Sequence, residues 1–168
     1  MPKTGAIQIA LATVGVYLAT GDPGVTITFP FAAAALWKGR GQWLKHLLAI
    51  YWTASAILAL SQAFMATVVL CYTIFDLSIA GAALLVTMHD PKRYDARWIG
   101  GLSMMLMPAH LAMSATHGAA NWLLYASILN AVFVLQSLIL TGWLDGVGRG
   151  ISGFLGRLRS IPVLRRED

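Results

Sequence analysis

Long apolar runs dominate the sequence, and short polar stretches separate them. Between residues 47 and 88 the only ionisable side chains are those of Asp76, Cys71 and two tyrosines. As one helix these 42 residues would extend for about 63 Å, whereas the hydrocarbon core of a bilayer is about 30 Å thick. The run therefore predicts two membrane-spanning helices, with the chain reversing at "SQAF", residues 61–64.

The whole pattern predicts four spanning helices, over residues 46–60, 65–87, 98–115 and 122–143. An earlier apolar region, residues 5–37, is interrupted by the turn sequence "GDPG" and predicts either a helical hairpin or a single crossing. The expected fold is an all-α, polytopic integral membrane bundle over residues 1–143. A basic amphipathic tail is expected over residues 144–168.

Basic residues cluster in connections that this topology places on one side of the membrane. The clusters are residues 38–45, residues 92–97 and the tail, whereas "SQAF" and "THGAAN" contain no Lys or Arg. The positive-inside rule therefore predicts a multi-pass protein of a bacterial-type inner membrane with a cytoplasmic C-terminus. Tryptophans stand at the predicted span ends, as in an aromatic belt: Trp37, Trp43, Trp98, Trp122 and Trp143.

The composition excludes an ordinary soluble domain. Hydrophobic residues make up 58% of the 168 residues and charged residues 11%, against roughly 25% charged in soluble domains. The net charge of +5 comes from clusters beside apolar spans, so lipid is an expected partner and nucleic acid is not. The single cysteine, Cys71, excludes an internal disulfide and is expected to pack as a small hydrophobe. The N-terminus resembles a signal peptide but is expected to be retained as a membrane segment.

The tail alternates apolar and basic residues at helical spacing. This pattern predicts an amphipathic segment on the inner leaflet, in contact with anionic lipid. Its expected lipid-binding residues are Arg149, Arg157, Arg159, Arg165 and Arg166. The sequence "GRGISG" matches a dinucleotide-binding pattern, but it follows a membrane helix rather than a strand and predicts no nucleotide site.

Asp76 is the outstanding candidate for chemistry, because a charge near the centre of a spanning helix costs several kcal/mol and such residues usually face the bundle interior or water. Thr73 shares its stripe, which is otherwise composed of small residues. Two interpretations stay open. Asp76 is either a protonatable group in a pathway or a protonated, hydrogen-bonded side chain that fixes helix pairing.

The helix at 98–115 supplies the expected partner of Asp76. Pro108 predicts a kink just before His110, and His110 could reach Asp76 across a helix interface as a proton relay or as one buried hydrogen bond. The other polar residues on this arc are Ser103, Ser114 and His117. Copper ligation by its Met and His residues, and haem ligation by His46 and His89, are weaker alternatives, so no metal or cofactor is predicted.

The helix at 122–143 is polar on opposite sides, with Asn130 on one face and Gln136 on the other. Such a helix is expected to contact neighbours on both sides, including other subunits. Asn130 joins Thr73, Asp76, Ser103, His110, Ser114 and His117 as a pore or proton-relay candidate. The sequence contains no hydrolase, metalloprotease or Walker motif, so no enzyme activity and no catalytic residue are expected.

Three functions remain. The first is a small oligomeric pore or permeabilising protein, similar in general design to the holin-like lysis proteins. The second is a membrane scaffold or accessory subunit of a larger complex. The third is a small proton-coupled transporter that uses Asp76 and His110, although no inverted repeat is visible in the sequence.

Overall fold

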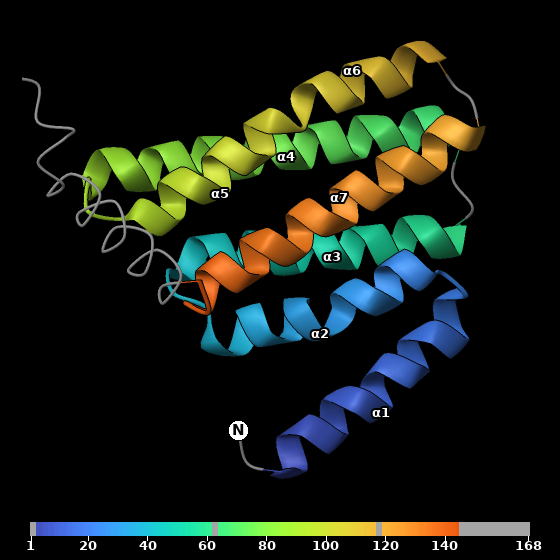
Figure 1. The fold of residues 1–168 in the computed structure, drawn as a ribbon, viewed down its shortest axis with the longest axis horizontal. Coiled ribbons are helices and arrows are strands. Elements are labelled where there is room, and N and C mark those ends of the chain that lie inside the picture. The colour runs from blue at the N-terminus through green and yellow to red at the C-terminus, as the bar shows by residue number, and fades with distance from the viewer. Residues whose placement is uncertain (1–2, 62–63, 117–118, 145–168) are drawn as a thin grey trace, which may run out of the picture.

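The computed structural model describes residues 3–61, 64–116 and 119–144, which form an assembly of helices (Figure 1). The chain order is α1 (Lys3–Thr20), α2 (Pro23–Lys38), α3 (Gln42–Ser61), α4 (Met65–His89), α5 (Tyr94–Met105), α6 (Met107–Thr116) and α7 (Ala119–Leu140). The all-α prediction is therefore confirmed for this part of the chain.

By length and composition, three helices among the described residues could cross a membrane. Their apolar segments are Trp43–Ser61 in α3, Met65–His89 in α4 and Asn121–Leu140 in α7, with 19, 25 and 20 residues. These helices indicate a multi-pass membrane protein. The fourth predicted span, residues 98–115, is divided between α5 and α6, of 12 and 10 residues, and neither is long enough to cross alone.

The division between α5 and α6 lies where the sequence predicts a kink. Leu106 interrupts the helix, and its N–H bonds to the Ser103 carbonyl, three residues back, over 3.1 Å. Pro108 follows in the first turn of α6, where a missing N–H is tolerated. The chain therefore changes direction between α5 and α6 beside this proline. His110 follows two residues after Pro108, so this change of direction determines where its side chain lies.

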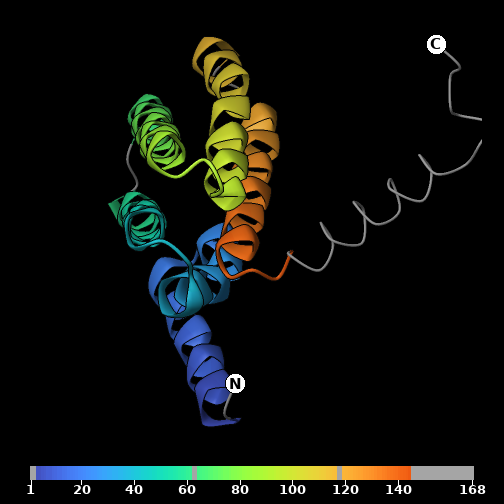
Figure 2. The same cartoon turned by 90° about the vertical axis from the view of Figure 1, so that its left-hand side faces the viewer.

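The region 5–37 forms a helical hairpin of α1 and α2. Gly21 ends α1 with a φ of 62°, a conformation that favours glycine. Asp22 caps α2, because its Oδ1 accepts the Val25 N–H over 3.0 Å, and Pro23 occupies the first turn. Figure 1 shows the two helices running in opposite directions from this turn, and α1 projects away from the other helices in Figure 2.

The loops that carry the predicted basic clusters meet at one end of the bundle, which we call the basic end (Lys38, Arg40, Lys45, Lys92, Arg93 and Arg97) (Figure 1). The Arg40 N–H donates to the Leu140 carbonyl over 2.9 Å and so joins the α2–α3 loop to the end of α7. Gly41, with a φ of 79°, lies against the Arg93 guanidinium of the α4–α5 loop. The α1–α2 turn lies at the opposite end (Figure 1).

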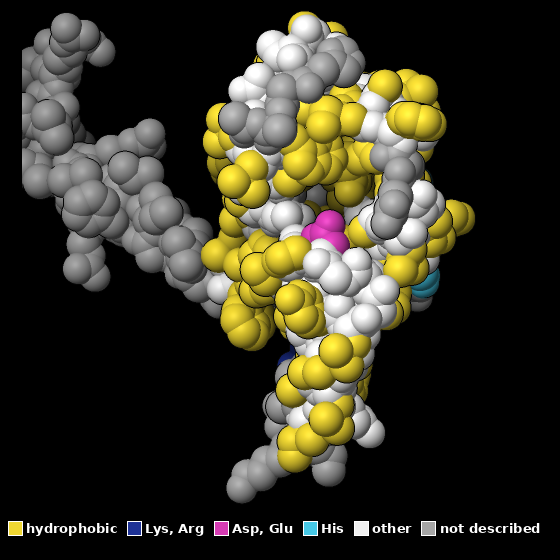
Figure 3. All heavy atoms as spheres, turned by 90° about the vertical axis from the view of Figure 1, so that its right-hand side faces the viewer, with side chains coloured by type: hydrophobic (Ala, Val, Ile, Leu, Met, Phe, Trp, Pro, Cys, Tyr) yellow, Lys and Arg dark blue, Asp and Glu magenta, His cyan; other side chains and the backbone are white. Residues whose placement is uncertain are grey.

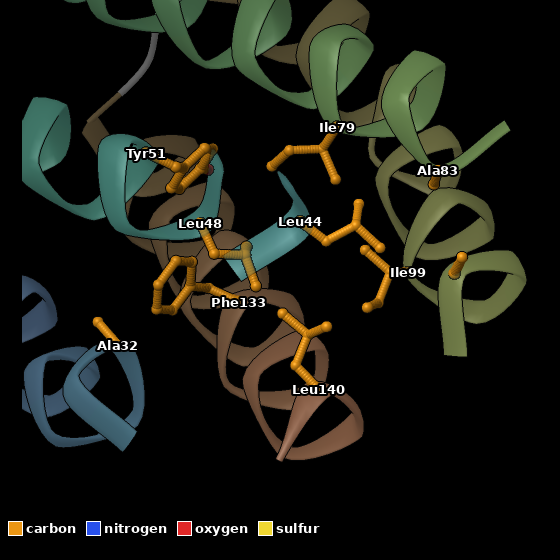
Figure 4. Packing of buried hydrophobic residues seen from close by; sticks show 10 residues of the cluster. Ala32, Leu44, Leu48, Tyr51, Ile79, Ala83, Ile99, Phe133 and Leu140 are labelled. Carbon is orange, nitrogen blue, oxygen red and sulfur yellow. The ribbon is translucent and has the colours of Figure 1, made fainter. Parts of the chain in front are cut away.

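Two clusters of buried apolar side chains hold the helices together. The larger lies toward the basic end and joins α2, α3, α4, α5 and α7 (Figure 4), with Leu44, Leu48, Ile79, Ile99, Phe133 and Leu140 among its members. The smaller joins α4, α6 and α7 through Val69, Leu106, Met113, Tyr125 and Leu129. Large apolar side chains also cover the outer faces of α1 and α4, as expected for helices that contact lipid or other subunits.

Candidate functional site

Asp76 lies inside the bundle, on the turn of α4 between the two apolar clusters. Only 1% of its surface is exposed. Its carboxylate is held on both oxygens: Ser103 Oγ donates to Oδ1 over 3.1 Å, and His110 Nε2 lies 3.0 Å from Oδ2. The predicted meeting of Asp76 and His110 therefore occurs within one chain, between α4 and α6.

His110 connects Asp76 to a residue of α7. The second ring nitrogen, Nδ1, lies 2.6 Å from the Tyr125 hydroxyl, and the two rings pack edge to face with centroids 5.6 Å apart. The exposed fraction is 3% for each of these two residues. Both imidazole nitrogens are therefore engaged, and neither contacts bulk water.

Ser103 connects Asp76 to a second residue of α7. Gln136 Nε2 donates to Ser103 Oγ over 2.8 Å and to the Ile99 carbonyl over 3.3 Å. Because Ser103 Oγ accepts this bond, its own proton is directed to the Asp76 carboxylate. The result is a buried network, Tyr125–His110–Asp76–Ser103–Gln136, that joins α4, α5, α6 and α7.

The geometry allows the network to take up one proton without moving a heavy atom. With neutral His110 and ionised Asp76, the imidazole donates from Nε2 to the carboxylate and accepts the Tyr125 proton at Nδ1. When the imidazole gains a proton, Nδ1–H donates instead to the Tyr125 oxygen and the Asp76 carboxylate balances the charge. The Tyr125 hydroxyl thus changes from donor to acceptor when the Asp76–His110 pair gains a proton.

A cavity of about 70 Å³ lies between α2, α3, α4 and α7 and opens beside the α1–α2 turn. Figure 3 shows this end of the molecule, where an acidic side chain lies in a hollow among hydrophobic side chains. Tyr51 and Tyr72 line the cavity, with ring centroids 5.5 Å apart. The two tyrosines therefore form part of the cavity wall, Tyr51 from α3 and Tyr72 from α4.

The remaining predicted residues occupy different places. Asn130 lines the cavity rather than the network. The Thr73 hydroxyl donates to the Val69 carbonyl of its own helix over 2.8 Å, and the exposed Ser114 donates to the Leu111 carbonyl over 2.8 Å. His117 and the tail arginines (Arg149, Arg157, Arg159, Arg165 and Arg166) lie outside the described residues.

Sequence reasoning missed Tyr125 as a site residue and assigned Gln136 no role in the site. The signal is helical spacing, because positions 125, 129, 132 and 136 fall on one face of a helix. Gln136 and Tyr125 therefore share one face of α7, so this spacing could have identified Tyr125 as a neighbour of the buried polar residues. Asp22 was read only as a turn residue, and its place at the cavity depends on the packing of α2 against α7.

An ion pair at the basic end stands apart from the buried network. Arg93 donates from Nε and Nη2 to the two Asp95 oxygens over 2.8 and 2.7 Å. The bond to Asp95 raises the pKa of Arg93. Partial burial raises the pKa of Asp95, but the hydrogen bonds and charge of Arg93 lower it by more, so the net pKa lies below its ordinary value of 3.8.

Comparisons of this chain with protein-family models, with curated proteins and with solved structures found no match.

Proposed function

We propose that this chain is a small proton-coupled membrane carrier in which Asp76 and His110 bind and release the transported proton. The observation that carries the proposal is the contact between His110 Nε2 and Asp76 Oδ2 at 3.0 Å, with both side chains almost fully buried. A buried, titratable Asp–His pair within membrane-spanning helices is typical of proton pathways.

The cavity also supports this function, because α4 and α7, which carry Asp76 and Tyr125, contribute to its wall. It opens at the end of the bundle away from the basic loops, and Tyr51 and Tyr72 line it. Tyrosine hydroxyls both donate and accept protons, so they can extend a relay. The proposed route runs from the cavity through these hydroxyls to the pair.

The proposal includes a topology. The predicted span 98–115, which is divided between α5 and α6, crosses the membrane as one kinked helix, and α3, α4 and α7 supply the other crossings. The basic end faces the cytoplasm of a bacterial-type cell, by the positive-inside rule, and the cavity opens outward. The α1–α2 hairpin then enters from the cytoplasmic side and turns at Gly21.

Proton flux into liposomes tests the function directly. Purified full-length protein is reconstituted with an internal pH dye, and a potassium diffusion potential drives protons inward. Wild type is expected to acidify the lumen, and Asp76→Asn is expected to abolish the flux, because an amide has no negative charge to balance a protonated His110. Asp90→Asn, the same change at an exposed carboxylate of the basic end, is the matched control and should retain full flux.

The same vesicles separate the other predicted functions. An oligomeric pore would release an encapsulated fluorescent dye, and it would do so in proportion to protein density. A scaffold would conduct neither protons nor dye while remaining folded, as judged by thermal unfolding of the purified protein. Either result would contradict the carrier, as would proton flux that Asp76→Asn leaves unchanged.

A further inference from the structure

The lining of the cavity beside Asp22 includes two buried hydroxyls whose protons are directed to backbone carbonyls. The Thr28 hydroxyl donates to backbone carbonyls of α2 at 2.8 and 3.1 Å, and the Ser55 hydroxyl donates to the Tyr51 carbonyl at 2.9 Å. A hydroxyl has one proton and two lone pairs, so the free capacity of each oxygen is to accept. Both residues are buried and line the cavity.

The aromatic wall of the cavity follows the same rule. Trp52 Nε1 donates to the Val25 carbonyl over 3.1 Å, which uses its only polar hydrogen and fixes the ring against α2. The ring also packs against Phe29 with centroids 5.1 Å apart. Trp122 and Tyr51 line the same cavity, and the face of an aromatic ring attracts cations.

Asp22 adds a formal negative charge to this lining. Its Oδ1 accepts the Val25 N–H, and the carboxylate still has acceptor capacity on both oxygens. The basic residues of the connecting loops lie at the other end of the bundle (Figure 1). A cavity with a negative charge, two accepting hydroxyls and aromatic side chains is complementary to a small ligand that carries a positive charge and donates hydrogen bonds.

We propose that this cavity binds a small ammonium ion, either ammonium itself or methylammonium. The ion donates to the Asp22 carboxylate and to the Thr28 and Ser55 hydroxyls, and it lies against the Trp52 ring. The volume of about 70 Å³ holds two or three water molecules of about 30 Å³ each, which suits these ions and excludes tetramethylammonium.

The inference deepens the proposed function by naming the class of solute, and it rests on that function for transport only. Binding itself depends on the cavity and is measured without a membrane potential. A failure of binding and a failure of proton flux are therefore separate results.

The experiment is an equilibrium titration of purified full-length protein in detergent, followed by intrinsic tryptophan fluorescence. Trp52 and Trp122 line the cavity, so occupation should change their emission. Methylammonium chloride is added at constant ionic strength, up to about 0.1 M, with sodium chloride as the matched salt and tetramethylammonium chloride as the size control. A saturable change with methylammonium alone is expected.

Asp22→Asn is the decisive variant, because asparagine caps a helix as well as aspartate does and only the charge is lost. The apparent affinity should fall by roughly ten- to a hundredfold, as expected when a hydrogen bond to a charged group is removed. Asp90→Asn is the control of equal charge and should bind as wild type. An unchanged thermal midpoint for Asp22→Asn shows that the fold is intact.

Gly24→Ala tests the shape of the site through a second residue. A Cβ at Gly24 would lie closer to Asn130 Nδ2 than van der Waals contact allows and 3.1 Å from Asp22 Oδ1, so both side chains must shift at the cavity. Because Asp22 Oδ1 also caps α2, the expected result is weaker binding together with a small loss of stability. A response to methylammonium that sodium chloride reproduces, that Asp22→Asn retains in full, or that is absent from wild type would overturn the proposal.

Discussion

His110 Nε2 lies 3.0 Å from Asp76 Oδ2 in a part of the bundle where the two side chains are 3% and 1% exposed. A lone charge is costly to bury, but an imidazolium beside a carboxylate has no net charge. In the proposed carrier, uptake of a proton by the pair therefore raises its net charge from −1 to zero. Release of this proton leaves a net negative charge on the pair inside the bundle, and the hydrogen bond from Ser103 to Asp76 stabilises that state.

Tyr125→Phe is expected to remove the hydrogen bond to His110 Nδ1 and little else. The ring keeps its packing, and the free energy of unfolding should fall by about 1–3 kcal/mol, because a buried nitrogen loses its partner. Nitrogen NMR of labelled histidine should show a changed tautomer or protonation at His110. An unaltered His110 signal would show that Tyr125 does not fix the ring.

Gln136→Leu and Ser137→Ala form a matched pair of neighbours on α7, exposed by 2% and 1%. Gln136 donates to Ser103 and to the Ile99 carbonyl, whereas Ser137 Oγ has no hydrogen-bond partner among the described residues. Gln136→Leu should lower the free energy of unfolding by about 1 kcal/mol or more, and Ser137→Ala should not lower it. Thermal unfolding in detergent measures both, and equal midpoints would contradict the network.

Gly100→Ala and Gly101→Ala test the approach of α5 to α4. A Cβ at Gly100 would lie 2.9 Å from the Ala83 Cβ, whereas at Gly101 nothing lies within 4 Å. Gly100→Ala should therefore destabilise the protein by about 1–3 kcal/mol through overpacking. Gly101→Ala should be neutral or stabilising by up to about 1 kcal/mol, because alanine favours a helix. The same thermal assay would reveal a reversed order, which would contradict this packing.

The Arg93–Asp95 pair is expected to make stability depend on acid pH. Because the pKa of Asp95 is lowered on folding, its contribution is fully present above the ordinary value of 3.8 and is lost as the pH falls through the lower folded pKa. Thermal midpoints between about pH 5 and pH 2.5 should fall more steeply for wild type than for Asp95→Asn. Parallel curves for the two proteins would contradict the assignment.

The sequence allowed the Asp76–His110 contact to be predicted, because helical periodicity places each residue on an inward face and the basic loops order the helices. The sequence also located the break in helical direction near Pro108. It did not predict that the chain would form two separate short helices there. A kinked helix and two consecutive helices can have the same sequence length and the same apolar pattern, so the sequence does not distinguish them.

Other features depend on how helices distant in the sequence pack. Tyr125 was not identified because a tyrosine on an apolar face is equally typical of a core. Asp22 reads as a turn residue at the level of sequence, and in the structure it caps α2. Asp22 also lines the cavity, and this depends on how α2 packs against α3 and α7, which the local sequence does not determine.

Both ends of the buried network belong to α7. Tyr125 and Gln136 lie 11 residues apart, about 16 Å along the helix axis, and each holds a different partner of Asp76. Two anchors this far apart fix the angle of α7 about its axis as well as its height against α5 and α6. Neither anchor touches the carboxylate directly, since Tyr125 reaches Asp76 through His110 and Gln136 reaches it through Ser103, so the orientation of a whole helix depends on one buried side chain of α4.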